Sequence, residues 1–164
     1  MSAGSLLLGH DYNTANDMDW VTSQIAVGGM LYDSADMAKA KRQGVSHILN
    51  MNGADDARLA DAFGIEALWN HTPDDFQPKP PILFKRGVNF AKMALANKEN
   101  KLLIHCAAGI HRAPMMTLAV LASRGWSIED AMRHIKKCRP CAWFPDVYVN
   151  SVRHWLRESR AKRN

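Results

Sequence analysis

Apolar residues along the chain form two kinds of pattern, short continuous runs and longer stretches with a helical period. The short runs predict strands at 24–28, 45–49, 65–69 and 102–104. The longer stretches predict helices at 33–44, 56–63 and 81–97, between about Pro114 and Gly125, from Ser127 onward, and at 146–160. Because strands alternate with helices, this order predicts an α/β fold with a largely parallel sheet. The run at 102–104 is apolar on successive residues, which indicates a strand covered on both faces.

Two segments of the chain show neither pattern. Residues 1–19 are polar and rich in Asp and Asn, so we expect an N-terminal arm there. A single domain at 20–160 and a basic tail end at 161–164 follow it. Residues 70–81 are rich in proline and include two aspartates, which predicts a loop of about a dozen residues. Loops of that length in compact domains are often functional.

Composition narrows the class of protein. Hydrophobic residues make up 47% of the chain and charged residues 23%, and no run approaches the roughly 18 apolar residues of a membrane span. The three cysteines indicate a reducing compartment, so we expect a cytoplasmic protein without membrane contact, and we expect a monomer. Part of the net charge of +5 lies near the C-terminus, at Arg153, Arg157, Arg160, Lys162 and Arg163. We interpret these cations as a solvated helix end rather than a nucleic-acid surface, because no stretch interleaves aromatic and basic residues.

The segment 103–114 carries the candidate chemistry. It is predicted to run from a buried strand through a tight loop into a helix N-terminus, a geometry that points backbone N–H groups into one concavity and favours an anion. Gly109 supplies the backbone freedom that such a turn needs. The helix N-terminus stabilises the thiolate of Cys106, which makes that residue a candidate nucleophile. At the end of the loop, the planar guanidinium of Arg112 can hold two phosphate oxygens at once, which a lysine cannot.

His105-Cys106, five further residues and Arg112 resemble the signature of cysteine-dependent phosphatases, with no gap in the spacing. Three other places resemble atypical dual-specificity phosphatases: Ile25–Gly28, Gly44–Asn50 and Arg139–Pro140. The resemblance covers about residues 20–158. It implies a three-layer α/β/α phosphatase fold, with a central, mostly parallel sheet of four or five strands, a shallow pocket, and neither a metal nor a cofactor. The phosphate-binding loop that it implies consists of His105, Ala107, Ala108, Gly109, Ile110 and His111.

The resemblance also implies a general acid on the loop at 70–81. Asp74 takes that role in our interpretation, and Asp75 is the alternate. We expect His105 to shape the loop by hydrogen bonding, and His111 to be either a rim residue or a solvated spectator. One departure is Ala113, where the family usually has a Ser or Thr whose hydroxyl donates to the cysteine sulfur. Its absence predicts either slower breakdown of the phosphoenzyme or support of the sulfur by another donor.

The function that the resemblance implies is hydrolysis of phosphotyrosine, and of phosphoserine or phosphothreonine, in a phosphorylated protein substrate through a phosphocysteine. The loop carries no lysine, which argues against a phosphoinositide pocket. An RNA or carbohydrate phosphatase of the same fold and a catalytically weak, phosphate-binding pseudophosphatase are the alternatives. Four residues outside the motif are candidate zinc ligands: His134, Cys138, Cys141 and His154. The two cysteines are also a candidate redox pair. We favour ordinary cysteines, because a zinc motif normally shows a second matching half.

Overall fold

The computed structural model describes residues 17–163 and contains one sheet. Its strands are β1 (Met18–Trp20), β2 (Ile25–Gly28), β3 (His47–Asn50), β4 (Glu66–Trp69) and β5 (Leu102–His105). Their order across the sheet is β1-β2-β5-β3-β4. The pairs β2–β5, β5–β3 and β3–β4 are parallel, and β1 runs antiparallel to β2 at the edge. The predicted α/β class and the mostly parallel five-stranded sheet are confirmed.

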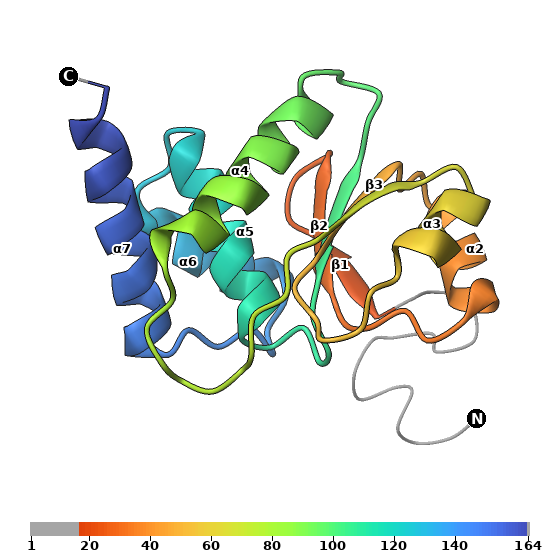
Figure 1. Ribbon diagram of the computed structural model, residues 1–164, viewed down its shortest axis with the longest axis horizontal. Helices are drawn as coiled ribbons and strands as arrows, with labels where there is room; N and C mark the ends of the chain where they lie inside the picture. Colours follow the sequence, from red (N-terminus) through yellow and green to blue (C-terminus); the bar gives the residue numbers. More distant parts are fainter. Residues whose placement is uncertain (1–16, 164) are drawn as a thin grey trace.

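Helices cover both faces of this sheet. They are α2 (Ser34–Arg42), α3 (Ala57–Ala62), α4 (Pro81–Leu95), α5 (Arg112–Ser123), α6 (Ile128–Cys138) and α7 (Asp146–Ala161). Figure 1 shows α4, α5, α6 and α7 on one side of the strands and α2 with α3 on the other, which gives the three layers expected. None of the helices among residues 17–163 combines the length and the apolar character needed to cross a membrane.

Local sequence signals account for several helix starts. Asp33 precedes α2, and its carboxylate accepts a hydrogen bond from the N–H of Asp36 at 2.9 Å. Ser127 caps α6 in the same way through the N–H of Asp130 at 3.1 Å. Pro81, which has no N–H to satisfy, is the first residue of α4. These three starts agree with the predicted ones.

The central strand β5 joins the two hydrophobic cores. Successive strand residues face opposite sides of a sheet, so Leu102 and Ile104 pack into the core under α4–α7, while Leu103 packs into the core under α2 and α3. All three side chains are fully buried. The strand is therefore covered on both faces, as the continuous apolar run predicts, and its end is fixed from both sides.

Several predicted boundaries are wrong by a few residues. Met18 and Asp19 were expected in the arm, but they belong to β1, because the Met18 side chain is buried in a core and the strand pairs with β2. β3 begins at His47 rather than Val45, since the N–H groups of Ser46 and His47 both bond to the carbonyl of Lys101 outside the strand ladder. Residues 1–16 of the expected arm and residue 164 of the expected tail lie outside the described residues.

Candidate active site

Cys106 is the first residue after β5, at the carboxyl end of the most central strand of the sheet. This edge of a parallel sheet is where α/β proteins commonly bind ligands. The side chain is almost completely enclosed, since Cys106 is 2% exposed, and its Sγ accepts a hydrogen bond from the N–H of Gly109 at 3.2 Å. The loop thus turns back over the sulfur.

Gly109 makes this turn possible. Its φ is +68°, a conformation that side chains with a Cβ rarely adopt. A Cβ at this position would also lie 2.6 Å from the carbonyl oxygen of Gly28. The sequence-based expectation that this glycine supplies backbone freedom agrees with the geometry.

The loop holds a set of free donors. Within residues 17–163, five consecutive or nearly consecutive backbone N–H groups have no protein acceptor: those of Ala107, Ala108, Ile110, His111 and Arg112. His111, the N-cap of α5, places no side-chain acceptor over the first turn of the helix. Unsatisfied N–H groups at a helix N-terminus attract anions through their hydrogen bonds and through the helix dipole. The loop is therefore built to surround an oxyanion beside Cys106.

Arg112 adds a fixed cation to these amides. It is 9% exposed, and one terminal nitrogen donates to the carbonyl of Thr72 at 2.9 Å and to that of Met51 at 3.4 Å. Its Nε–H is buried without any acceptor in the described part of the chain. A buried donor without a partner is costly, and a phosphate oxygen would satisfy it. The bond to Thr72 also joins the phosphate loop to the loop that carries both candidate acids.

Asp74 lies against the phosphate loop. One carboxylate oxygen is 2.9 Å from Nδ1 of His111, and the other accepts a hydrogen bond from the hydroxyl of Tyr148 at 2.8 Å. Partial burial acts to raise the pKa of Asp74, but these two hydrogen bonds, with the charges of His111 and Arg112, outweigh it and hold the pKa below its ordinary value. His111 is thus a contact of Asp74 and not a solvated spectator.

Asp75 points to a different partner. Its carboxylate forms an ion pair of 2.7 Å with Nζ of Lys79, whose side chain is 3% exposed and also donates to the carbonyl of Pro73. Hydrogen bonds from Lys79 and from the N–H of Gln77 lower the pKa of Asp75. The contacts of Asp75 therefore stay within the loop at 70–81, whereas Asp74 contacts the loop that follows Cys106.

His105 fixes the strand end from which the phosphate loop starts. It is 1% exposed, and its Nε2 lies 2.8 Å from a carboxylate oxygen of Asp56. The other oxygen of Asp56 accepts from the side-chain amide of Asn50 at 3.0 Å. The expected hydrogen-bonding role of His105 agrees with this network, in which each buried polar group has a partner.

A family model described as the catalytic domain of dual specificity phosphatases matches residues 30–158. The chain belongs to the dual-specificity phosphatase family. Protein phosphatase Slingshot homolog 3 of Rattus norvegicus is 30% identical over 116 residues, which is 68% of this chain and 17% of that protein. Dual specificity protein phosphatase 26 of the same organism is 26% identical over 119 residues, 68% of this chain and 56% of the relative. The chain thus spans 17% and 56% of the lengths of these two relatives.

Solved structures show the same fold. PTPMT1 in complex with PI(5)P superposes with a TM-score of 0.80 at 19% identity, covering 91% of this chain and 100% of that one. At that identity the likeness establishes the architecture alone. The resemblance to atypical dual-specificity phosphatases and the phosphatase fold are confirmed.

In this dual-specificity phosphatase domain, Arg139 supports the loop from behind. It is 1% exposed and donates to the carbonyls of Gly109 at 2.8 Å and Ala108 at 3.1 Å. One terminal nitrogen also donates to the carboxylates of Asp17 and Asp19, each at 3.0 Å, and the other donates to Asp17 at 3.1 Å. Burial acts to lower the pKa of Arg139, but the two carboxylates raise it above its ordinary value. In a trans peptide unit the C=O and the N–H point in opposite directions. By holding the carbonyl of Ala108, Arg139 therefore orients the next N–H, that of Gly109, away from itself, and this N–H donates to Cys106 Sγ.

Sequence reasoning did not assign this support. Asp19 lies in β1 and Asp17 just before it, and a spacing of two residues, which puts side chains on the same side of an extended chain, was the available signal. Tyr148 offered no such signal, because 74 residues separate it from Asp74. Asp56 is likewise 49 residues from His105.

Aromatic side chains line the edge of the site. The ring of Phe76 stacks on Tyr148 with an interplanar angle of 10° and meets the edge of His111 at 5.1 Å. Trp143 contacts His111 at 5.3 Å between ring centroids. Phe76 and Trp143 remain 45% and 51% exposed, so they present apolar surface to solvent beside Asp74.

Ala113 and the candidate metal or redox residues around Cys138 remain to be placed. Ala113 is fully buried and supplies no hydroxyl, and among the described residues the donor to Cys106 Sγ is the N–H of Gly109. Cys138 lies 3.6 Å from Nε2 of His134, and its burial raises the pKa of the Cys138 thiol. No cluster of three or more His, Cys, Asp or Glu suited to a metal ion occurs among the residues that the structure describes.

Proposed function

We propose that this chain hydrolyses phosphate monoesters on protein side chains through a covalent phosphocysteine. The observation that carries the proposal is a set of donors around Cys106 that have no acceptor within residues 17–163: five loop N–H groups and the buried Nε–H of Arg112. A phosphoryl group presents three equatorial oxygens, and its transfer is catalysed chiefly by positioning and by donors that hold these oxygens.

In the first step, the thiolate of Cys106 attacks phosphorus, forming the P–S bond as the P–O bond to the side chain breaks. Asp74 gives its proton to the leaving oxygen. The guanidinium of Arg112, already anchored on Thr72, holds phosphate oxygens in the transition state. Its geometry costs no reorganisation when the reaction occurs.

In the second step, the Asp74 carboxylate takes a proton from water as that water attacks phosphorus. The P–S bond breaks, inorganic phosphate leaves, and the Cys106 thiolate is restored. Because Ala113 provides no hydroxyl to the sulfur, we expect this step to limit turnover.

The acid role requires a protonated Asp74, whereas in the free site its pKa is lowered. A phosphomonoester dianion bound in the loop brings negative charge close to Asp74. A nearby like charge disfavours the ionised carboxylate and so favours the protonated form in the complex. Substrate binding therefore prepares the acid for the first step.

Phosphotyrosine is the substrate that the rim supports best. The exposed rings of Phe76 and Trp143 can contact a planar aromatic ring, and offset or edge contacts between rings are favourable. Phosphoserine and phosphothreonine lack such a ring and would rely on the loop alone. The names of the two rat relatives, a protein phosphatase and a dual specificity protein phosphatase, support a phosphoprotein substrate.

The rival proposal is a binding module that holds phosphate without turnover, and Ala113 is the observation that favours it. The test compares hydrolysis of p-nitrophenyl phosphate by the wild type and by Cys106→Ser, with phosphate binding measured by calorimetry. We expect the variant to lose at least ~10³-fold in kcat, because removing a covalent nucleophile abolishes the pathway. We also expect it still to bind phosphate through the amides and Arg112. Equal rates for the two proteins would overturn the proposal, and phosphate binding with no wild-type turnover would establish the binding module.

A further inference from the structure

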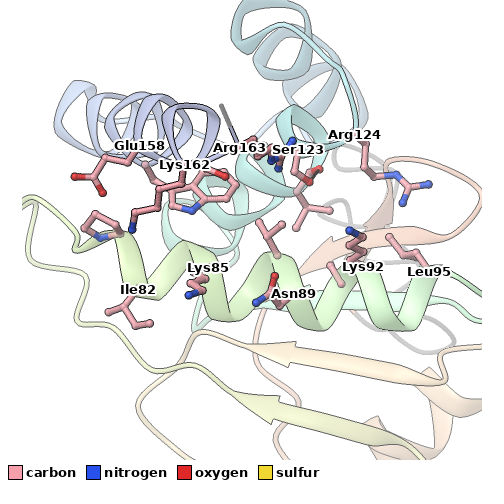
Figure 2. A pocket seen from close by; sticks show the side chains of 16 residues that line it. Ile82, Lys85, Asn89, Lys92, Leu95, Ser123, Arg124, Glu158, Lys162 and Arg163 are labelled. Atoms are coloured by element: carbon pink, nitrogen blue, oxygen red, sulfur yellow. Dashed lines mark hydrogen bonds between the residues drawn. The ribbon is translucent and has the colours of Figure 1, made fainter.

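A groove of about 700 Å³ runs between α4, the end of α5 and the C-terminal half of α7. Figure 2 shows the side chains that line it, which come from all three helices. From Ile82 to Leu95 the groove follows α4 for thirteen residue steps, or about 20 Å at 1.5 Å per residue. It shares no lining residue with the candidate active site described above.

Positive charge dominates this groove. Its cations are Lys85, Lys92, Arg124, Lys162 and Arg163. The acidic side chain in the lining is Glu158, which lies 3.2 Å from Nε2 of His154 on its own helix. Across residues 17–163, none of the five cations pairs with a carboxylate. Their charge is therefore available to an anionic partner.

The floor of the groove is apolar. Val88 is half-buried, and three other floor residues, Ala91, Leu95 and Val120, are buried against the core. Ile82, at the start of α4, is 51% exposed at one end. An apolar floor with cations along its margins is the complement of a segment that carries apolar side chains on one face and carboxylates at its sides.

We propose that this groove, defined by the five cations and the apolar floor residues above, binds an acidic amphipathic segment of a partner protein. Such a segment lays its apolar face on the floor in the manner of a helix in a groove. The length of the α4 wall, about 20 Å, matches three to four turns of helix. Lys162 and Arg163, which the sequence suggested were merely solvated, lie where they would meet its carboxylates.

Other occupants fit the groove less well. Single-stranded nucleic acid needs exposed aromatic faces for stacking, whereas Trp155 is 7% exposed and packs on Phe84 at 5.9 Å. A membrane surface is met by apolar side chains that project outward, whereas here the apolar residues form the floor. A second copy of this chain, with its net charge of +5, is a poor electrostatic partner for a basic groove.

The test uses the full chain and a labelled 14-residue helical peptide with leucines on one face and glutamates beside them, followed by fluorescence anisotropy. We expect Lys85→Glu/Lys92→Glu to weaken binding at least about tenfold, because two attractive contacts become repulsive. The matched control is Lys136→Glu/Lys137→Glu on α6, which makes the same change in net charge at exposed positions outside the groove. We expect the control to change the Kd less than about threefold. Circular dichroism verifies folding, and Lys85→Gln/Lys92→Gln replaces the reversal if that variant unfolds.

Several results would overturn the proposal: failure of the wild type to bind the peptide, equal weakening by both charge reversals, or undiminished binding when glutamine replaces every glutamate. Tighter, Lys85- and Lys92-dependent binding of a 12-nucleotide single-stranded RNA, or of phosphatidylserine vesicles, would assign the groove to that ligand instead. A dimer in analytical ultracentrifugation that the same reversal abolishes would assign it to a second copy. Anisotropy reads binding alone, so these outcomes do not depend on whether the chain turns over a phosphate ester.

Discussion

The phosphate loop and the α4–α7 groove both present positive potential to an anion, but they do so by different means. In the loop, the donors are backbone N–H groups and one guanidinium, and Cys106 and Arg112 are almost completely buried. In the groove, the cations are exposed ends of long side chains such as Lys85 and Lys92. The loop donors are fixed before a ligand arrives, whereas the groove cations must lose rotamer freedom on binding.

This difference suits the loop to catalysis and the groove to binding a partner. Donors held in place beside the buried Cys106 and Arg112 can stabilise a transition state, since they need no reorganisation when the reaction occurs. Exposed cations are screened by salt and adapt to many shapes, which suits them to docking rather than to catalysis. The two regions should therefore respond differently to the same kind of substitution.

The largest expected effect comes from exchanging arginine for lysine in both regions. Arg112→Lys should lower kcat/KM for p-nitrophenyl phosphate by about 10²–10³-fold, because the ammonium group cannot reproduce a planar fork anchored on Thr72. Arg124→Lys in the groove should keep the Kd of the acidic peptide within about twofold, since a screened surface charge has little directional requirement. Steady-state kinetics and anisotropy measure the two. If both substitutions have equally small effects, the loop needs directed hydrogen bonds from its arginine no more than the groove does.

The next effect concerns the two aspartates of one loop. Asp74→Asn should lower kcat/KM at least about 10²-fold, because it removes the general acid of the first step, and it should flatten the fall in kcat/KM on the alkaline side. Asp75→Asn is the matched control, and its kcat/KM should change only a few-fold, since Asp75 pairs with Lys79. The pH dependence of p-nitrophenyl phosphate hydrolysis checks both. A silent Asp74→Asn beside a damaging Asp75→Asn would reverse the assignment.

The smallest effect is a shift in the pH profile. Burial raises the pKa of Tyr148 to about 12, so its hydroxyl stays protonated and donates to Asp74 throughout the assay range. That hydrogen bond lowers the pKa of Asp74, and the acid form of Asp74 disappears as pH rises through this value. Tyr148→Phe removes the bond but keeps a ring to stack on Phe76, so the alkaline fall in kcat/KM, which reports the free site and the first step, should move to higher pH by up to about one unit.

The exposed Tyr32 provides the control for this shift. Tyr32 is 75% exposed, and its substitution by Phe should leave the profile where it is in the wild type. A profile that stays in place or moves to lower pH in Tyr148→Phe would show that the hydrogen bond does not set the acidity of the general acid.

The parts of the candidate site that depend on neighbours in sequence could be proposed from the sequence. The hydrogen bond from Gly109 to Cys106 spans three residues, and Arg112 follows three residues later at the start of α5. A strand, a glycine turn and a helix start follow one another along the chain, so their chemistry can be recognised from spacing alone. The mostly parallel sheet was predictable for the same reason, because the alternation of strands and helices is a local pattern.

The contacts between residues far apart along the chain were not predicted. Asp74 and Asp75 are adjacent and alike in sequence, and the contacts of His111, Tyr148 and Lys79 distinguish them. The support of the loop by Arg139 requires the carboxylates of Asp19 in β1 and of Asp17 just before it, more than a hundred residues away along the chain. No periodicity connects residues at such separations, and only packing brings them together.

The sequence by itself determined the class of fold, and it was enough to propose Cys106 as the nucleophile and the turn after it as the phosphate-binding loop, because each depends on residue types at short range. Tertiary structure decided which aspartate faces the phosphate loop, what holds that loop from behind, and where unpaired cations gather between α4 and α7. Electrostatic interactions and hydrogen bonds act over a few ångströms of space whatever the distance along the chain. A group's chemistry is therefore readable from its sequence, but its partners are set by the fold.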